Sequence, residues 1–367
     1  MILSSIRQSK AKFLSIFSAA LLSISTTSFS VESDIQGLDL LHQKGELSAL
    51  FEQLSSLGYA NYSPEHFQLY VYALADIDLD KAEEAADKAI QTFDTNPDMF
   101  LMHAEIMGRQ AQNSVFSILA YAKKAKNSLE IAVKLAPNEP KYLQGLMTFH
   151  LFAPSIAGGD TEQALVHANA ISTLDEELGY SAIASYHWAV DNNDNAISIL
   201  KEGLTKYPSS FTLLGQKADL YVNDEKYSDA IATYSTITQQ TITALPTSQG
   251  TDEGEDASED YEQKSYTLLN AHYQIGRVAL LSNTQLELGI EHLQRYIELY
   301  QSAEYNLSGL PSLDWAHLRL AGLLFANEEV LTANNALEQI NKPDAADIKS
   351  VHKKLSKKIS RAVKKLR

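Results

Sequence analysis

Two neighbouring segments of the chain carry alanines at one fixed spacing, and this spacing constrains the fold more than any other feature. Ala184 and Ala196 are 12 positions apart in YSAIASYHWAVDNNDNAISILKEGLTKYP, residues 180–208. Ala218 and Ala230 have the same spacing in the next segment, and Ala196 precedes Ala230 by 34 positions. Antiparallel helices approach closely only where small side chains meet, so the spacing predicts a repeated helix pair.

The residues around these alanines resemble the tetratricopeptide repeat (TPR) family. Its helix-turn-helix unit of 34 residues has small residues at positions 8 and 20 and large apolar residues nearby. Leu200, Gly203 and Pro208 fit the first unit, whereas His187 and Lys217 occupy positions where the family has an apolar residue. The register continues in both directions over nearly all of the chain after residue 30. Its further matches are Ala82, Ala89, Ala125, Leu129, Ala132, Pro137, Gly276, Gly289, Leu293, Tyr296, Leu320, Ala321, Ala333, Leu337 and Ile340.

The resemblance implies an all-α fold, a right-handed α-solenoid of stacked antiparallel helix pairs with about seven or eight units. The composition agrees, because helix formers dominate and the chain has only 9 prolines and 16 glycines. One unit cannot bury its own apolar face, so neighbouring units share a continuous core. We expect TPR-like repeats over residues 31–240 and further repeats over residues 265–343.

The stretch FAPSIAGGD, which ends at Asp160, interrupts the repeat. Gly145 and Ala164 occupy the two small positions of this unit but are 19 positions apart, which places seven extra residues in the turn. Pro154 ends the first helix, the glycine pair permits positive φ, and Asp160 is predicted to cap the next helix with Gln163 as its capping-box partner. The turn also resembles one found in exported bacterial repeat proteins, including the repeat component associated with tripartite periplasmic transporters.

The first thirty residues are expected to form a secretory signal peptide. Arg7, Lys10 and Lys12 precede the apolar FLSIFSAALLSI, and Ser28 and Ser30 follow at the small-residue cleavage positions. The apolar segment is too short to span roughly 30 Å of hydrocarbon. We therefore expect an exported protein, periplasmic or otherwise secreted. The chain has no cysteine, which excludes disulfides and thiolate metal sites.

Charge is distributed unevenly along the chain. The last nineteen residues hold 9 Lys or Arg and no acid, and the first twelve hold 3 more basic residues. The remainder carries 18 basic and all 46 acidic residues, a net charge of −28. A body this acidic repels nucleic acid and anionic membranes and lacks the basic groove that phosphate backbones need. We expect a protein or peptide partner that is neutral or basic rather than acidic, and no nucleic acid.

Two segments near the C-terminus depart from the repeat pattern. The stretch TDEGEDASEDYEQ holds seven acids within eleven residues, and residues 241–264 are predicted to be an acidic flexible linker. In residues 344–367, Ile348, Leu355 and Ile359 belong to one apolar stripe with lysines on the remaining face, which predicts a basic amphipathic helix. This helix either caps the open end of the solenoid or contacts an anionic membrane peripherally.

In the TPR family the first helix of each unit lines the concave surface, chiefly through positions 2, 5, 9 and 12. The resemblance implies a partner-binding groove there, and both tryptophans of the chain fall on it. Aromatic anchors with a few polar groups are typical of peptide and small-ligand sites. The alternative for each residue is that it packs against the adjacent helix. The nine candidate residues are Tyr142, Phe149, Ser185, Trp188, Asp219, Asn270, Tyr273, Arg277 and Trp315.

No catalytic or metal-binding motif is found in the sequence. The ten histidines are scattered, and no two have the i, i+4 spacing of a helical metal site. We therefore predict no enzymatic activity, no metal and no cofactor. The leading hypothesis is an exported TPR scaffold or adaptor that binds a polypeptide on its concave surface. The alternative is a periplasmic solute- or lipid-binding component of an envelope transporter, supported by the FAPSIAGGD turn.

Overall fold

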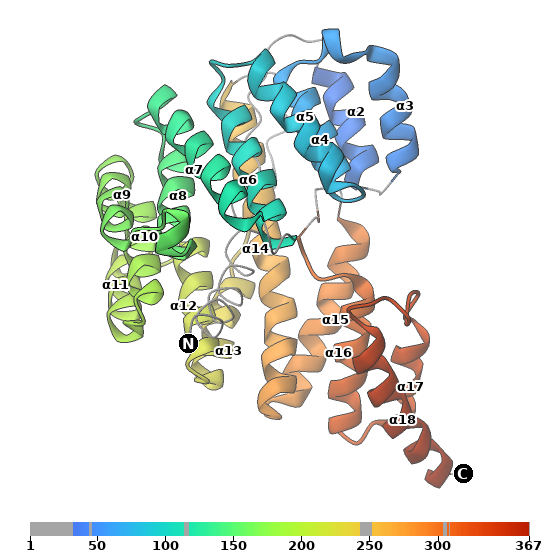
Figure 1. The fold of residues 1–367 in the computed structure, drawn as a ribbon. Coiled ribbons are helices and arrows are strands. Elements are labelled where there is room, and N and C mark those ends of the chain that lie inside the picture. Colours follow the sequence, from blue (N-terminus) through green and yellow to red (C-terminus); the bar gives the residue numbers. More distant parts are fainter. Residues whose placement is uncertain are drawn as a thin grey trace. The chain divides into compact units, whose positions relative to one another are not determined.

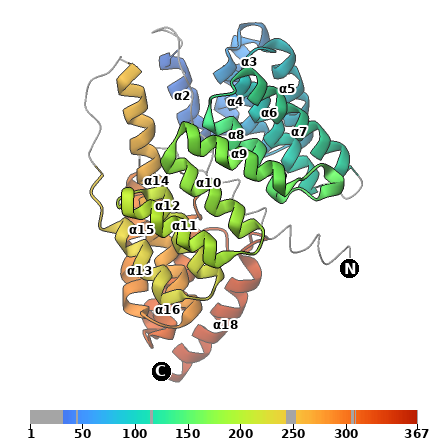
Figure 2. The same cartoon turned by 90° about the vertical axis from the view of Figure 1, so that its left-hand side faces the viewer.

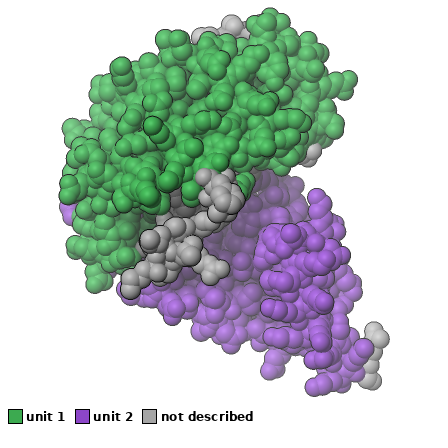
Figure 3. All heavy atoms as spheres, in the orientation of Figure 1, with its two compact units in different colours: residues 1–199 green, residues 200–367 purple. Residues whose placement is uncertain are grey.

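The computed structural model describes residues 32–43, 46–113, 117–242, 252–303, 307 and 309–366 (Figure 1). Within these ranges the regular secondary structure is helical and no strand occurs, which confirms the all-α prediction. The expected signal peptide lies outside the described residues. The chain divides into two compact units, unit 1 over residues 1–199 and unit 2 over residues 200–367 (Figure 3).

Unit 1 is a row of helix pairs. Consecutive helices pack against one another, and the first helices of successive pairs, α4, α6, α8 and α10, also contact in succession. Its helices are α2 (Glu32–Gln43), α3 (Leu47–Leu57), α4 (Pro64–Ala75), α5 (Leu79–Thr92), α6 (Pro97–Asn113), α7 (Ile118–Leu135), α8 (Pro140–Phe152), α9 (Thr161–Leu174) and α10 (Glu176–Ala189), with short 3-10 turns η1 (Tyr59–Asn61) and η2 (Ser155–Ala157). Helix α11 (Asn193–Lys206) crosses the division between the units.

Unit 2 repeats this arrangement around one continuous hydrophobic cluster. Its first helices α12, α14 and α16 contact in succession, and each packs against the helix that follows it. The helices of unit 2 are α12 (Phe211–Asn223), α13 (Tyr227–Thr238), α14 (Asp252–Ser282), α15 (Leu286–Ser302), α16 (Leu313–Ala326), α17 (Val330–Glu338) and α18 (Lys349–Leu366).

The small residues that predicted the repeat lie where helices cross. Ala184, Ala196, Ala218 and Ala230 are all 0% exposed. At Gly276 a Cβ would lie 2.3 Å from Leu293 Cγ, so a larger residue would displace this side chain from the crossing of α14 and α15. In the folded chain, residues at the 12-residue spacing are therefore small and buried between helices.

The FAPSIAGGD segment is an enlarged turn between α8 and α9, as expected. Gly158 adopts a φ of 96°, and a Cβ on Gly159 would lie 1.8 Å from the carbonyl oxygen of Ala153, so both positions require glycine. The Asp160 carboxylate accepts hydrogen bonds from the backbone N–H groups of residues 162 and 163 and caps α9. The capping-box expectation is wrong, because the backbone N–H of Asp160 donates to the His150 carbonyl at 3.0 Å instead of to Gln163.

Helix α14 differs from the sequence-based expectation at its start. It begins at Asp252, so residues 252–264 are helical where a flexible linker was predicted, and residues 243–251 lie outside the described residues. Glu and Ala are good helix formers, and acids near a helix N-terminus interact favourably with its dipole. An acidic composition therefore did not by itself exclude a helix.

Helix α18 lies at the outer end of unit 2, beyond α16 and α17 (Figures 1 and 2). Ile348, just before the helix, and Ile359 are buried, and Leu355 and Val363 pack partly buried against the same hydrophobic cluster. The apolar stripe of this helix thus covers the end of the unit 2 core, as a terminal cap does in a repeat array.

Candidate partner-binding surface

The nine candidate residues lie on first helices of both units and differ in accessibility. Asp219 is exposed, whereas Ser185, Trp188, Asn270, Arg277 and Trp315 are half-buried. Tyr142, Phe149 and Tyr273 are buried in the hydrophobic clusters. Neighbouring helices cover these three rings, so the rings contribute packing rather than exposed contact area.

Trp315 and Tyr273 are joined in unit 2 by an arginine that the repeat register did not single out. The Arg319 guanidinium lies 5.2 Å from the Trp315 ring and 5.4 Å from the Tyr273 ring, and its Nε donates to the Tyr273 hydroxyl oxygen at 2.5 Å. The Trp315 indole N–H donates to a carboxylate oxygen of Asp347 at 2.6 Å. Cation–π contacts and hydrogen bonds therefore fix the orientation of Trp315 while its ring stays half-buried.

A second group of polar side chains runs along α14. Arg277 Nε donates to Gln274 Oε1 at 2.5 Å, and Gln274 Nε2 donates to Asn270 Oδ1 at 3.2 Å. All three side chains are half-buried and lie at helical spacings of three and four residues, so they share one face. That face presents a guanidinium and amide groups on the same helix as Tyr273.

Asp219 on α12 completes this surface, which we name the α12–α14–α16 face: Asp219, Asn270, Gln274, Arg277, Trp315 and Arg319. The buried Tyr234 hydroxyl donates a hydrogen bond to Asp219 Oδ1. Loss of hydration raises the pKa of Asp219, while the hydrogen bond from Tyr234 and the positive charge of Arg277 act in the opposite direction. Asp219 is exposed as a residue, while its carboxyl is held against the Tyr234 hydroxyl.

Two first helices of unit 1 are joined by a buried polar contact. Tyr72 on α4 donates to Glu105 Oε2 on α6 at 2.8 Å, and Glu105 is only 7% exposed. Burial raises the pKa of Glu105 to about 8, and the charge of Arg109 only partly offsets this. Neither Tyr72 nor Glu105 was among the candidates, although Ala104, a small residue directly before Glu105, marks the helix crossing.

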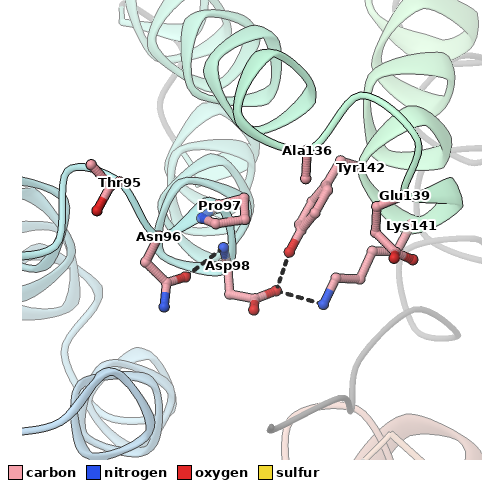
Figure 4. Close-up of a pocket in the computed structure, with 8 residues that line it drawn as sticks. All are labelled: Thr95, Asn96, Pro97, Asp98, Ala136, Glu139, Lys141 and Tyr142. Carbon is pink, nitrogen blue, oxygen red and sulfur yellow. Dashed lines mark hydrogen bonds and ion pairs between the residues drawn. The ribbon is translucent and has the colours of Figure 1, made fainter.

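A shallow depression of about 550 Å³ lies between the starts of α6 and α8 (Figure 4). The carboxylate of Asp98 accepts a hydrogen bond from the Tyr142 hydroxyl at 2.9 Å and pairs with Lys141 Nζ at 2.7 Å. Thr95, Asn96 and Glu139 also line it, so its walls are largely polar. Tyr142 therefore joins two helices through its hydroxyl group, while its ring is buried.

The two remaining candidates lie on α10. The Trp188 ring is 5.8 Å from the Phe152 ring at a tilted angle, so it packs against the end of α8. Ser185 lies one turn earlier on the same helix. The structure therefore brings four of the nine candidates, Asp219, Asn270, Arg277 and Trp315, onto the α12–α14–α16 face, and leaves Ser185 and Trp188 on a separate helix of unit 1.

Ser128, His103 and Asp87 form a hydrogen-bonded chain in unit 1 with the residue types of a catalytic triad. Ser128 Oγ lies 2.8 Å from His103 Nδ1, and His103 Nε2 lies 2.9 Å from Asp87 Oδ1. Ser128 is 2% and His103 3% exposed, so a substrate cannot reach the hydroxyl. Burial also lowers the pKa of His103. These residues connect α5, α6 and α7 and act structurally.

No group of three or more His, Asp or Glu side chains in the described part of the chain could hold a metal ion. None of the helices in the described ranges is long and apolar enough to cross a membrane.

Comparison with known proteins identifies the fold. No protein-family profile and no curated protein sequence matches the chain. Yeast Tom70 is similar in structure with a TM-score of 0.58 and 13% identity, over 99% of this chain and 72% of Tom70. A TPR protein from Parabacteroides merdae has a TM-score of 0.44 and 14% identity over 80% and 98% of the two chains. The type IV pilus biogenesis factor PilW has a TM-score of 0.40 and 11% identity, over 68% of this chain and 97% of PilW. The chain has a TPR-type helical repeat fold.

Proposed function

We propose that this chain is an exported scaffold that binds a polypeptide along the α12–α14–α16 face. One observation carries the proposal: aromatic, amide and guanidinium groups meet on three consecutive first helices of unit 2. Tryptophan and arginine are the residues most often found at the centre of protein interfaces. A row of first helices presents an extended surface, which suits a peptide segment better than a compact small molecule.

The side chains of this face match the groups of a polypeptide. Asn270 and Gln274 carry amide donors and acceptors that pair with peptide backbone. Neither Arg277 nor Arg319 takes part in an ion pair among the described residues, so their remaining N–H groups can donate to backbone carbonyls. The Trp315 ring offers apolar contact area whose orientation is already fixed. Preorganised contacts of this kind reduce the entropy lost on binding.

The charge of the chain supports a neutral or basic partner. The net charge is −16, and it is −28 for the chain without its first twelve and last nineteen residues. Asp219 supplies the face with an acidic residue toward a basic side chain of the partner. The expected signal peptide supports export, and we propose the periplasm as the compartment in which the partner is met.

Affinity capture from a cell-envelope extract tests this function. The chain from Val31 onward is the bait, and an Asn270→Ala, Trp315→Ala double variant removes two groups of the face. We expect a polypeptide partner whose affinity for the variant, measured afterwards by titration calorimetry, falls at least about 30-fold. Ile156→Ser is the matched control, because this exposed apolar residue lies in the turn after α8 and outside the face. Circular dichroism verifies the fold of each variant.

The remaining outcomes separate the alternatives. Loss of the partner in Trp188→Ala but not in the double variant would move the site to α10. A small molecule or lipid retained in native mass spectrometry, without a protein partner, would favour the transporter-associated solute-binding function instead.

A further inference from the structure

The cationic side chains of α18 take no part in capping unit 2. Its apolar residues contact the core, with Ile359 fully buried and Leu355 partly buried. At 100° per residue, the cations of α18 other than Lys349 lie on the side opposite this stripe. Seven of them are exposed, and none takes part in an ion pair among the described residues: Lys353, Lys354, Lys357, Lys358, Arg361, Lys364 and Lys365.

A capping role does not account for these charges. A cap requires a polar exterior, which mixed or neutral polar residues provide equally well. The nearest ion pair of the helix involves only its first residue, where Lys349 Nζ lies 3.4 Å from Asp344. Seven unpaired like charges on one helix repel one another, so the array costs folding stability and is expected to have a partner of opposite charge.

We propose that this cationic face of α18 docks the chain on an anionic lipid surface through charge alone. The proposal concerns a different surface from the α12–α14–α16 face and does not depend on the function proposed for that face. An 18-residue helix is about 27 Å long, and its cations lie along one side, so a planar array of headgroups contacts all of them at once. A compact anion contacts only one or two.

The residue types favour lipid over nucleic acid. Six of the seven cations are lysines, which act as hydrated point charges, whereas arginine makes the bidentate contacts that select particular phosphates and bases. No Phe, Tyr or Trp lies in α18, so the stacking contacts typical of single-strand binding are missing from this helix. The acidic repeat body repels a polyanion that would wrap around it, whereas a planar surface can contact the exposed side of α18 without being wrapped.

The mode of attachment follows from the packing. A helix that inserts into a bilayer needs a free apolar face, but the stripe of α18 is occupied by the core of unit 2. Only Val351 and Leu366, near the two ends, are exposed apolar residues of the helix. Binding therefore rests on the cations and is expected to disappear at high salt.

Vesicle co-sedimentation of the chain from Val31 onward tests the proposal, because the removed apolar segment would bind vesicles by itself. We expect binding to vesicles with 30% phosphatidylglycerol in phosphatidylcholine and none to pure phosphatidylcholine. The variant Lys353→Gln, Lys357→Gln, Lys364→Gln should bind on the order of 100-fold more weakly. The matched control is Lys123→Gln, Lys134→Gln, Lys201→Gln, which makes the same change in net charge at exposed positions of other helices. It should bind within about two-fold of the unmodified chain.

Several results would overturn the proposal. Equal losses in both triple variants would mean that net charge, not the α18 face, governs binding. Binding that persists at 0.5 M salt, or that Leu366→Ser reduces as strongly as the α18 triple variant does, would indicate apolar insertion. Binding of an acidic polypeptide such as polyglutamate without any vesicle binding would assign the face to a protein partner.

Discussion

The first helices of the two units use their polar side chains differently. In unit 1 the Glu105 carboxyl is buried and accepts a hydrogen bond from Tyr72, which joins α4 to α6. In unit 2 the polar groups of Arg277 and Asn270 stay half-buried, and Asp219 is exposed. The first helix of a repeat can therefore connect neighbouring helices or present groups to a partner. The fold alone does not determine which, because neighbouring side chains decide how much of each group is covered.

The units also differ in what limits the approach of their helices. At Gly179 in unit 1, a Cβ would lie 2.4 Å from the Cα of Ser172 on the adjacent helix. At Gly276 in unit 2, it would meet the side chain of Leu293 at 2.3 Å. A backbone cannot move without separating the helices, whereas a leucine can change rotamer.

The largest expected effect tests this difference in packing. We expect Gly179→Ala to lower the free energy of unfolding by about 4 kcal/mol and Gly276→Ala by about 2 kcal/mol, measured by urea denaturation. Gly108→Ala is the control, because no atom lies within 4 Å of its Cβ position in the middle of α6. It should raise stability by about 0.5–1 kcal/mol. Equal losses of stability in Gly179→Ala and Gly276→Ala would contradict the difference between a backbone contact and a side-chain contact.

The next effect concerns the buried carboxyl of unit 1. The pKa of Glu105 is raised to about 8, so the folded chain binds more protons than the unfolded chain between about pH 4.5 and 8. Stability contributed by protonated Glu105 is therefore lost as the pH rises through this window. Gln retains an acceptor for Tyr72 and does not titrate. We expect Glu105→Gln to raise the free energy of unfolding by about 3 kcal/mol at pH 9 and by little at pH 4.5, measured by urea denaturation at both pH values.

The exposed Glu130 provides the control for this measurement. Glu130→Gln makes the same chemical change at an exposed position, and its pH dependence is the reference for that of Glu105→Gln. A gain for Glu105→Gln that is equal at both pH values would mean that the effect comes from packing instead of ionisation.

A histidine pair gives unit 2 the opposite pH dependence. His272 Nδ1 lies 2.9 Å from His292 Nδ1, and burial lowers the pKa of His272 to about 4. The unfolded chain then binds more protons between about pH 6.5 and 4, so stability falls as the pH falls through this window. We expect His272→Gln to reduce the stability lost between pH 7 and pH 4 by about 2 kcal/mol, measured by urea denaturation.

The half-buried His352 on α18 serves as the matched site for this test. His352→Gln makes the same chemical change outside the histidine pair, and its pH dependence is the reference for that of His272→Gln. If both substitutions change it equally, the close His272–His292 contact is not the source of the acid sensitivity.

The smallest expected effect compares exposed apolar residues of the two units. Ile156, in the turn after α8, is 79% exposed, and Leu331 on α17 is 61% exposed. We expect Ile156→Ser and Leu331→Ser each to change the free energy of unfolding by less than about 0.5 kcal/mol, measured by calorimetry. A larger loss of stability in Ile156→Ser would mean that the turn packs against another part of the chain.

Much of the fold could be predicted from the sequence because repeat positions are set by local geometry. A helix crossing admits only small side chains, so the alanines at 184 and 196 defined a helix pair without any knowledge of distant residues. Asp160 was likewise predicted as a cap, because capping depends on residues within one turn. The apolar stripe of α18 predicted which of its sides faces the core.

Burial and contacts between distant residues were decided only in the tertiary structure. The register placed Phe149 and Tyr273 on first helices, but neighbouring helices cover both rings. Arg319 reaches Tyr273 across 46 positions of sequence, and the Tyr72–Glu105 hydrogen bond spans 33. Periodicity fixes the face of a helix on which a residue lies. What covers that face depends on side chains from other repeats, which the spacing within one repeat does not encode.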